Sequence, residues 1–183
     1  LAGRCQVYFV DAAHFVYGPF LAPPGGVWCF CRTFIKTPAG RQRLNVLGAL
    51  NAVTRQFVSV INETYVTAQT VCELLDHLRA LHGGTPGELP GAITLVLDNA
   101  RYQHCKKVVA HAATLGIDLL FLPSSSPNLN LIERLWKFIK KDCLNGRYYP
   151  THQQFRQAIL DSLAAINTRH RDALKSTLTL NFQ

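Results

Sequence analysis

Three acidic side chains carry most of the chemical information in this sequence. Asp11 follows the apolar run Tyr8–Val10, Asp98 follows the apolar run 93–97, and Glu133 lies 35 positions after Asp98. A carboxylate at the end of a hydrophobic strand is unfavourable unless something cationic compensates it. Three carboxylates that can converge therefore indicate a site for a divalent metal ion.

Carboxylate oxygens are the ligands that hard cations such as Mg²⁺ and Mn²⁺ prefer. Phosphoryl transfer commonly uses two such ions, about 4 Å apart. One ion lowers the pKa of an attacking water or 3′-hydroxyl, and the other stabilises the leaving oxygen. We therefore expect Asp11, Asp98 and Glu133 to be both the metal ligands and the catalytic residues, with Mg²⁺ or Mn²⁺ bound as two ions.

Each acid also has an ordinary structural explanation. Asp11 and Asp98 are both suited to turns at strand ends. The spacing from Asn130 to Glu133 matches a capping box, in which Asn130 is the N-cap and Glu133 reaches back to its backbone N–H. Glu133 is also placed to pair with Lys137 one helical turn later. On local grounds alone the capping box is the favoured interpretation of Glu133.

The composition points to a polyanionic partner. The chain has 183 residues, enough for one domain, and 19 basic against 11 acidic residues give a formal charge of +8. Nucleic acid is the leading candidate, and a basic protein without such a partner is the alternative. No apolar run reaches the length of a membrane helix, so no membrane partner is predicted. Six cysteines without a CxxC pair favour a reduced, cytosolic protein.

Hydrophobic periodicity predicts an α/β chain whose front half is antiparallel and whose rear half has parallel crossovers. Residues 92–97 and 117–122 are expected to be strands buried in the sheet. The other predicted strands are 5–10, 27–33, 44–53 and 56–61, and the predicted helices are 67–82, 103–115, a segment ending near 143, and 153–168.

This order of elements can bring the acids together. Open α/β sheets bind ligands beyond the carboxyl ends of their strands. Asp98 stands at such an end, and Glu133 lies near the start of the helix that follows the next strand. We therefore expect one edge of the sheet and a neighbouring helix to assemble the site.

Three segments that contain these acids resemble the catalytic domain of mariner-related insertion-sequence transposases, which belong to the DDE superfamily. They are residues 10–15, 97–104 and 122–136. The third segment is long and specific. The 34 residues between Asp98 and Glu133 match the family's spacing between its second Asp and its Glu. The resemblance covers essentially the whole chain.

The resemblance implies a ribonuclease H-like fold, with a mixed central sheet flanked by helices. It implies two-metal hydrolysis of DNA at the ends of a mobile element, followed by attack of the freed 3′-hydroxyl on target DNA. Asp11, Asp98 and Glu133 would be the catalytic acids. Double-stranded DNA would be the partner of a homodimer on paired element ends, acting in the bacterial cytoplasm on the nucleoid.

The sequence departs from the family pattern in two places and lacks one part of it. Ala12 stands where many relatives have an acid, and Leu131 stands where many have Pro. The N-terminal helix-turn-helix modules usual in the family are not in this sequence. We therefore expect residues 1–183 to be a single catalytic domain, a fragment of a longer protein.

Supporting roles are predicted for further residues. His104 lies six positions after Asp98, where relatives often have His, and Asn99 follows Asp98 directly. His104 could orient a water or contact a phosphate, and the alternative is a capped helix histidine. Trp136 is expected in the core rather than stacked on a base. Basic residues that could contact the DNA backbone, or simply form solvated faces, are Arg41, Arg43, Arg101, Lys106, Lys107, Lys137, Lys140, Lys141 and Arg147.

The leading hypothesis is therefore the catalytic core of a cut-and-paste DNA transposase. A nuclease of the same fold that only hydrolyses DNA is one alternative. A non-enzymatic DNA-binding protein derived from a transposase is another, and the three intact acids argue against it.

Overall fold

The computed structural model describes residues 5–18, 42–83, 92–123 and 130–178. The predicted strand 27–33 and Arg41 lie outside the described residues.

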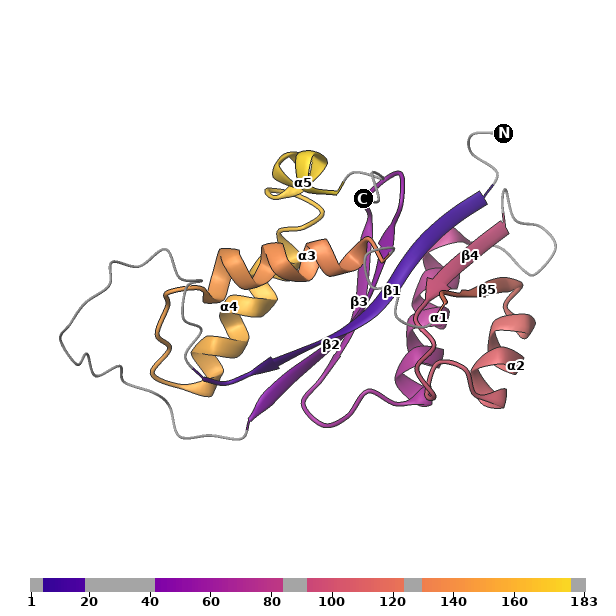
Figure 1. The fold of residues 1–183 in the computed structure, drawn as a ribbon, viewed down its shortest axis with the longest axis horizontal. Helices are drawn as coiled ribbons and strands as arrows, with labels where there is room; N and C mark the ends of the chain where they lie inside the picture. Colours follow the sequence, from indigo (N-terminus) through magenta and orange to yellow (C-terminus); the bar gives the residue numbers. More distant parts are fainter. Residues whose placement is uncertain (1–4, 19–41, 84–91, 124–129, 179–183) are drawn as a thin grey trace.

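A five-stranded sheet in the order β3-β2-β1-β4-β5 forms the centre of the structure (Figure 1). The central strand β1 is antiparallel to β2 and parallel to β4. This arrangement confirms the predicted mixed sheet, antiparallel in its front half and parallel behind. The strands are β1 (Cys5–Val16), β2 (Arg43–Asn51), β3 (Phe57–Asn62), β4 (Ala92–Leu97) and β5 (Ile117–Phe121).

The central strand β1 is longer than its apolar run predicts. The expected strand ends at residue 10, whereas β1 continues to Val16 because its second half pairs with β2. Pairing with β4 stops at Val10, opposite Leu97. Asp11 therefore lies inside a strand, at the first position where β1 no longer has a β4 neighbour.

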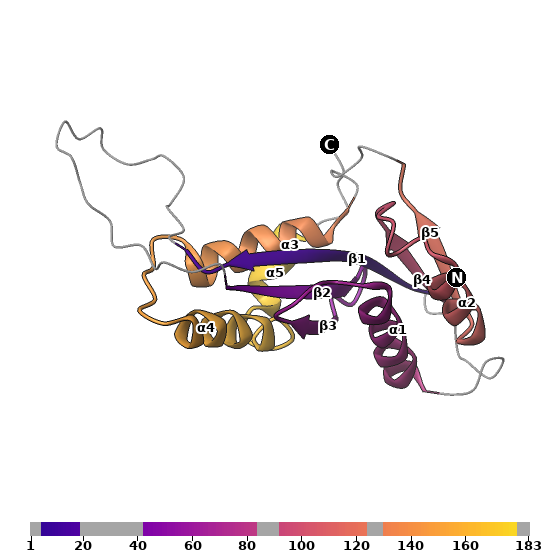
Figure 2. The same ribbon diagram turned by 90° about the horizontal axis from the view of Figure 1, so that it is seen from below.

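Helices cover both faces of the sheet (Figure 2). On one face lie α1 (Ala68–His82) and α2 (Lys106–Thr114). On the other lie α3 (Ile132–Ile139), α4 (His152–Ala164) and α5 (Arg171–Thr177). A π-helical turn, Lys140–Leu144, extends α3.

The hydrophobic core is divided into two clusters, one on each face of the sheet, because successive side chains of a strand point to opposite faces. Tyr8 and Val10 of β1 pack toward α1 and α2. Phe9 and Phe15 pack toward α3 and α4. Because both clusters use β1, this strand is fixed from both faces and can hold a side chain in a defined place.

Three predicted elements differ from the structure. The strand expected to be buried at 117–122 is instead β5, the edge strand of the described sheet. Leu119 packs toward α1 and α2, whereas Leu120 points to the opposite face and is 54% exposed. The helix expected over 103–115 begins only at Lys106. The last expected helix, 153–168, ends at Ala164, and a turn leads into the unpredicted helix α5. In the described part of the chain, no helix is long and apolar enough to cross a membrane.

Gly48 of β2 is the register partner of Asp11, and it leaves room for two aromatic rings. A Cβ atom there would lie 2.7 Å from both Phe57 Cε2 and Trp136 Cη2. Both rings belong to the packed core, so neither can move away easily.

We expect Gly48→Ala to lower the free energy of unfolding by about 1–2 kcal/mol, because the overlap outweighs the usual preference of a strand for Ala over Gly. Urea unfolding monitored by tryptophan fluorescence measures the change. Gly18→Ala is the matched control, since no atom of the described residues lies within 4 Å of its added Cβ. Equal unfolding midpoints for the two variants would contradict this account of the core.

Candidate active site

Asp11 is held in place by an indole from the opposite layer. The Trp136 Nε1–H of α3 donates to Asp11 Oδ2 at 3.1 Å. Trp136 is only 5% exposed, so its predicted core position is confirmed. Its hydrogen bond to the carboxylate was not predicted, because it joins residues 125 positions apart.

Asp98 lies beside Asp11 by strand register. It follows Leu97, the last residue of β4, whose partner on β1 is Val10. The two acids thus follow paired residues of neighbouring parallel strands, which are about 4.8 Å apart. Asp98 Oδ1 is buried, and no described atom gives it a hydrogen bond. Such an orphaned anionic oxygen is unfavourable without a cation.

Glu133 is half-buried in the first turn of α3. It lines a cavity of about 360 Å³ together with Asp11 and Trp136. The structure therefore places one residue of the predicted trio on each of β1, the end of β4 and the start of α3.

The capping box predicted for Glu133 is wrong. The N-cap of α3 is Leu131, in helical conformation, and no side chain caps this end of the helix in the described chain. Among the described ion pairs, Glu133 and Lys137 do not form one. The local structural explanations of this carboxylate are thereby removed.

Asn130 has a positioning role instead of the predicted capping role. Its side chain is 4% exposed, and its Nδ2 donates to the backbone oxygen of Val10 at 3.2 Å. Its own backbone oxygen accepts the Glu133 N–H at 3.2 Å. One residue thus connects the strand position before Asp11 to the helix position of Glu133. The competing carbonyl of Val10 is 120 residues away and cannot be found by local spacing.

The electrostatic environment of Asp11 is unfavourable to its charge. Burial raises the pKa of this carboxyl from 3.8 to about 6, and the nearby charges of Asp98 and Glu133 act in the same direction. Hydrogen bonds from the Ala12 backbone and the Trp136 indole lower the pKa but do not offset the increase. The charges of Asp98 and Glu133 are therefore close enough to Asp11 to disfavour its ionisation.

Tyr102 lies close to the acids, although no role was predicted for it. Burial, reinforced by the charges of Asp98 and Asp11, raises the pKa of the Tyr102 phenol to about 12. The phenol is therefore neutral at pH 7. Its oxygen accepts a hydrogen bond from Gln103 Nε2 at 3.3 Å, which leaves the O–H free to donate.

The donor set fits a hard divalent cation in its chemistry. It offers carboxylate oxygens only, with one buried oxygen unpaired and one pKa raised by neighbouring carboxylates. Within the described residues, however, no three His, Cys, Asp or Glu side chains are already close enough together to hold one ion. Cation binding would therefore require side-chain movement within the trio.

Neither His104 nor Asn99 lines this cavity, and Asp98 adjoins it only through its register position beside Asp11. His104 is exposed, lies before α2, and its ring contacts Phe121 at a centroid distance of 4.4 Å. Asn99 is exposed directly after Asp98.

The predicted basic residues divide by location. Lys137 and Lys140 line the same cavity as Asp11. Lys107 Nζ donates to Gln69 Oε1 at 2.7 Å, across α1 and α2. The Arg43 guanidinium is stacked 4.4 Å from the Tyr65 ring centroid. Arg101, Lys106 and Lys141 are exposed, and Arg147 is exposed at a different cavity.

A sequence family described as DDE superfamily endonuclease matches residues 6–156. This range is most of the 183 residues, and the chain belongs to the DDE superfamily of endonucleases. The resemblance to mariner-related transposases is confirmed at this level, and the mixed sheet with helices on both faces is the ribonuclease H-like fold. No curated protein sequence matches significantly.

Solved structures of transposases and integrases share the fold. The Mos1 mariner paired end complex with Mn aligns at a TM-score of 0.62 and 13% identity, over 97% of this chain and 56% of that chain. The Mos1 transposase catalytic domain with Raltegravir and Mg aligns at a TM-score of 0.57 and 13% identity, over 100% of this chain and 87% of that chain. The catalytic core domain of BIV integrase aligns at a TM-score of 0.53 and 13% identity, over 89% of this chain and 84% of that chain. This chain spans about half the length of the Mos1 chain in the paired end complex.

The raised pKa of Asp11 predicts a pH-dependent stability in metal-free protein. Its folded value, about 6, exceeds the ordinary 3.8, so the folded state holds this proton more tightly. The contribution of Asp11 to stability therefore falls as pH rises from about 4 to 6. We expect Asp11→Asn to match wild type at pH 4 and to exceed it by about 2 kcal/mol at pH 7.5.

Urea unfolding in EDTA at four pH values between 4 and 7.5 measures this difference. Asn keeps an oxygen to accept the Trp136 N–H, so packing is retained. Asp118→Asn, at an exposed position of β5, is the control for a change of charge alone. A constant difference between Asp11→Asn and wild type across this range would refute the electrostatic coupling.

Proposed function

We propose that this chain is the catalytic core of a DNA transposase that uses Asp11, Asp98 and Glu133 as its catalytic acids. The supporting observation is the placement of Asp11, fixed by Trp136, beside Asp98 and in one cavity with Glu133. The reaction would be phosphodiester hydrolysis at an element end, followed by joining of the 3′-hydroxyl to target DNA. Membership of an endonuclease superfamily supports the first step.

The three carboxylates would hold Mg²⁺ or Mn²⁺, in the two-ion arrangement that activates the nucleophile and stabilises the leaving oxygen. Structural neighbours with Mn and with Mg support this choice of cation. Trp136 would keep Asp11 oriented toward the cavity, and Asn130 would keep β1 and α3 in register. The neutral Tyr102 hydroxyl would donate a hydrogen bond near the acids without adding charge.

The partner would be double-stranded DNA. Lys137 and Lys140, at the rim of the cavity, would bind phosphates on either side of the reacting group, and the formal charge of +8 would favour their approach. Neighbours that are paired-end complexes support a homodimer on two element ends. A single catalytic domain over residues 1–183, acting with a separate helix-turn-helix region in the bacterial cytoplasm, stays a prediction.

Asp98→Asn tests the proposed chemistry. The variant should lose cleavage by at least about 100-fold, because a metal-ligand oxygen is removed, while its fold survives. The assay combines a labelled duplex carrying an uncleaved element end, a target plasmid and Mn²⁺, so that cleaved and joined products are measured separately. Wild type should yield joined products, whereas cleavage without joining would favour the nuclease that only hydrolyses. Mn²⁺ should raise the melting temperature of wild type and not of the variant, and equal stabilisation of both would refute the metal site.

Glu133→Gln separates metal binding from helix stability. Since Glu133 does not cap α3, Gln should leave the melting temperature within about 1 °C of wild type. Cleavage should nevertheless fall by about 100-fold, because the amide is a poor ligand for a hard cation. Glu73→Gln, on the exposed side of α1, supplies the same chemical change outside the cavity. Wild-type cleavage by Glu133→Gln would remove this residue from the proposed trio.

A further inference from the structure

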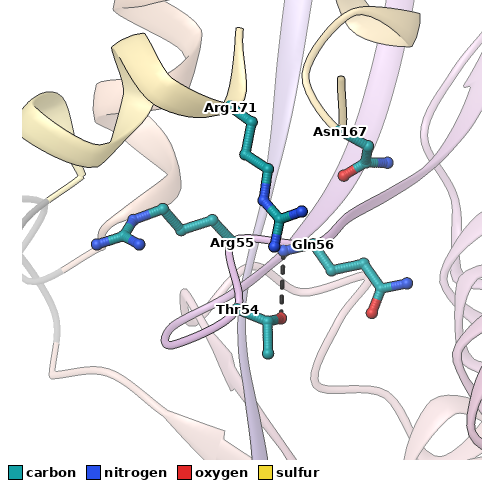
Figure 3. A pocket seen from close by; sticks show the side chains of 5 residues that line it. All are labelled: Thr54, Arg55, Gln56, Asn167 and Arg171. Carbon is teal, nitrogen blue, oxygen red and sulfur yellow. Dashed lines mark hydrogen bonds between the residues drawn. The ribbon is translucent and has the colours of Figure 1, made fainter. Parts of the chain in front are cut away.

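A second cavity, of about 280 Å³, lies at the tip of the β2–β3 hairpin (Figure 3). One side belongs to the hairpin turn, and the other to the segment between α4 and α5 and the first residue of α5. It shares no lining residue with the cavity at Asp11. The lining residues are Thr54, Arg55, Gln56, Asn167 and Arg171.

The hairpin side of this cavity is held by its own hydrogen bonds. Asn51 Oδ1 accepts the backbone N–H groups of Val53 and Thr54 at 2.9 and 2.8 Å. The Gln56 N–H donates to Thr54 Oγ1 at 3.3 Å. The turn is therefore ordered before any ligand arrives.

The helical side is tied to the same hairpin. Asn167 Oδ1 accepts the Phe57 N–H at 2.9 Å, and Asn167 Nδ2 donates to the Phe57 oxygen at 3.0 Å. The Asn167 side chain thus makes the two hydrogen bonds to the Phe57 backbone that a neighbouring strand would otherwise make. The two walls are consequently fixed relative to each other across 110 residues of sequence.

The cavity carries two positive charges and no negative one. Arg55 and Arg171 are its only charged lining residues among the described ones. Arg55 Nε is buried without a hydrogen-bond acceptor in the described chain. Asp172, the nearest acid along the sequence, is bonded to Lys175 at 2.5 Å. In Figure 3, Arg171 reaches from α5 over the turn, while Arg55 extends outward from the turn itself.

The backbone at Arg55 is also unusual. Its φ of 60° lies in the left-handed region, which Gly or Asn adopts at lower cost. An ordinary side chain there costs about 1 kcal/mol. Folding alone would favour a different residue at this turn, so the guanidinium itself requires an explanation.

We propose that this cavity binds a phosphodiester group of the DNA backbone. This inference rests on the proposed function, which supplies DNA as the partner. Guanidinium groups bind phosphate oxygens through paired hydrogen bonds, and two of them would be neutralised by one or two phosphate charges. The volume is at the lower end of ligand pockets, which suits a phosphate and its waters better than a whole nucleotide.

The position of the cavity fits DNA that also reaches the acids. The Ala52 N–H of the hairpin donates to the Val7 oxygen at 2.8 Å, four residues before Asp11 on β1. That separation is about 13 Å along the strand. Phosphates of one DNA strand repeat about every 3.4 Å along the helix axis, so a duplex at Asp11 reaches the level of Val7 in about four base pairs. The hairpin residues that line the cavity begin at Thr54, beyond that level. Asp11 contacts α3, the cavity is lined by the first residue of α5, and both helices pack on the same face of the sheet.

Salt-dependent DNA binding in EDTA tests the proposal without catalysis. The probe is a 30-base-pair duplex of arbitrary sequence, with dissociation constants measured by fluorescence anisotropy between about 50 and 200 mM salt. Arg55→Asn and Arg171→Gln should each reduce the log–log slope by about 0.9, the value for one phosphate contact. The affinity deficit of each variant should therefore shrink about 3.5-fold over that range.

Two controls make the result specific. Arg156→Gln removes the same charge from a guanidinium already paired with Glu63 at 2.8 Å, outside the cavity. Arg55→Asn should be at least as stable as wild type, because Asn tolerates the left-handed backbone, so misfolding cannot explain weaker binding. The double variant should have the slope of a single one if both arginines hold one phosphate.

Wild-type slopes in Arg55→Asn and Arg171→Gln, or changes no larger than that of Arg156→Gln, would overturn the proposal. Thermal protection by inorganic phosphate that is lost in the variants, with unchanged DNA binding, would also overturn the assignment to DNA. Loss of cleavage in the Asp98→Asn assay is independent of these outcomes. Failure of this cavity and failure of the proposed chemistry are therefore distinguishable.

Discussion

The hydrogen bond from Trp136 to Asp11 is the contact on which the rest of the site depends. The indole packs edge-on against Phe57 and Phe15, at centroid distances of 5.8 and 6.4 Å, and its N–H still reaches a carboxylate on the central strand. This is possible because Gly48 leaves the indole its space. Core packing therefore fixes the direction of a charged side chain. A shift of α3 would move both the Trp136 indole and the Asp11 carboxylate that it holds.

The elements with a clear local period could be predicted from the sequence. The apolar run 92–97 is β4, and the helical spacing over 67–82 is α1 within one residue. The end of β1 could not be predicted, because its last six residues are strand only through pairing with β2. The edge position of β5 depends on the order of the whole sheet, which its own apolar composition does not contain.

The same distinction between local and distant contacts applies to the site. The three acids were predicted from residue type, spacing and family resemblance. The prediction for Asn130 was wrong because a capping box is a local sequence pattern. Its side chain instead donates to the Val10 carbonyl, which belongs to a strand distant in sequence. The cavity at the tip of the β2–β3 hairpin was not predicted for a similar reason. Arg55 and Arg171 line one cavity only because Asn167 bonds the segment before α5 to Phe57 of β3.

The charges at the acidic cavity are close together yet left uncompensated. Lys137 and Lys140 line the same cavity as Asp11 and Glu133, but no ion pair joins them among the described residues. Internal pairing would lower the pKa of Asp11, whereas that pKa is raised to about 6. The acids would thus be available to an external cation, and the lysines to an external anion. A metal ion and a phosphodiester together would satisfy both sets, which is the composition of a DNA-cleavage site.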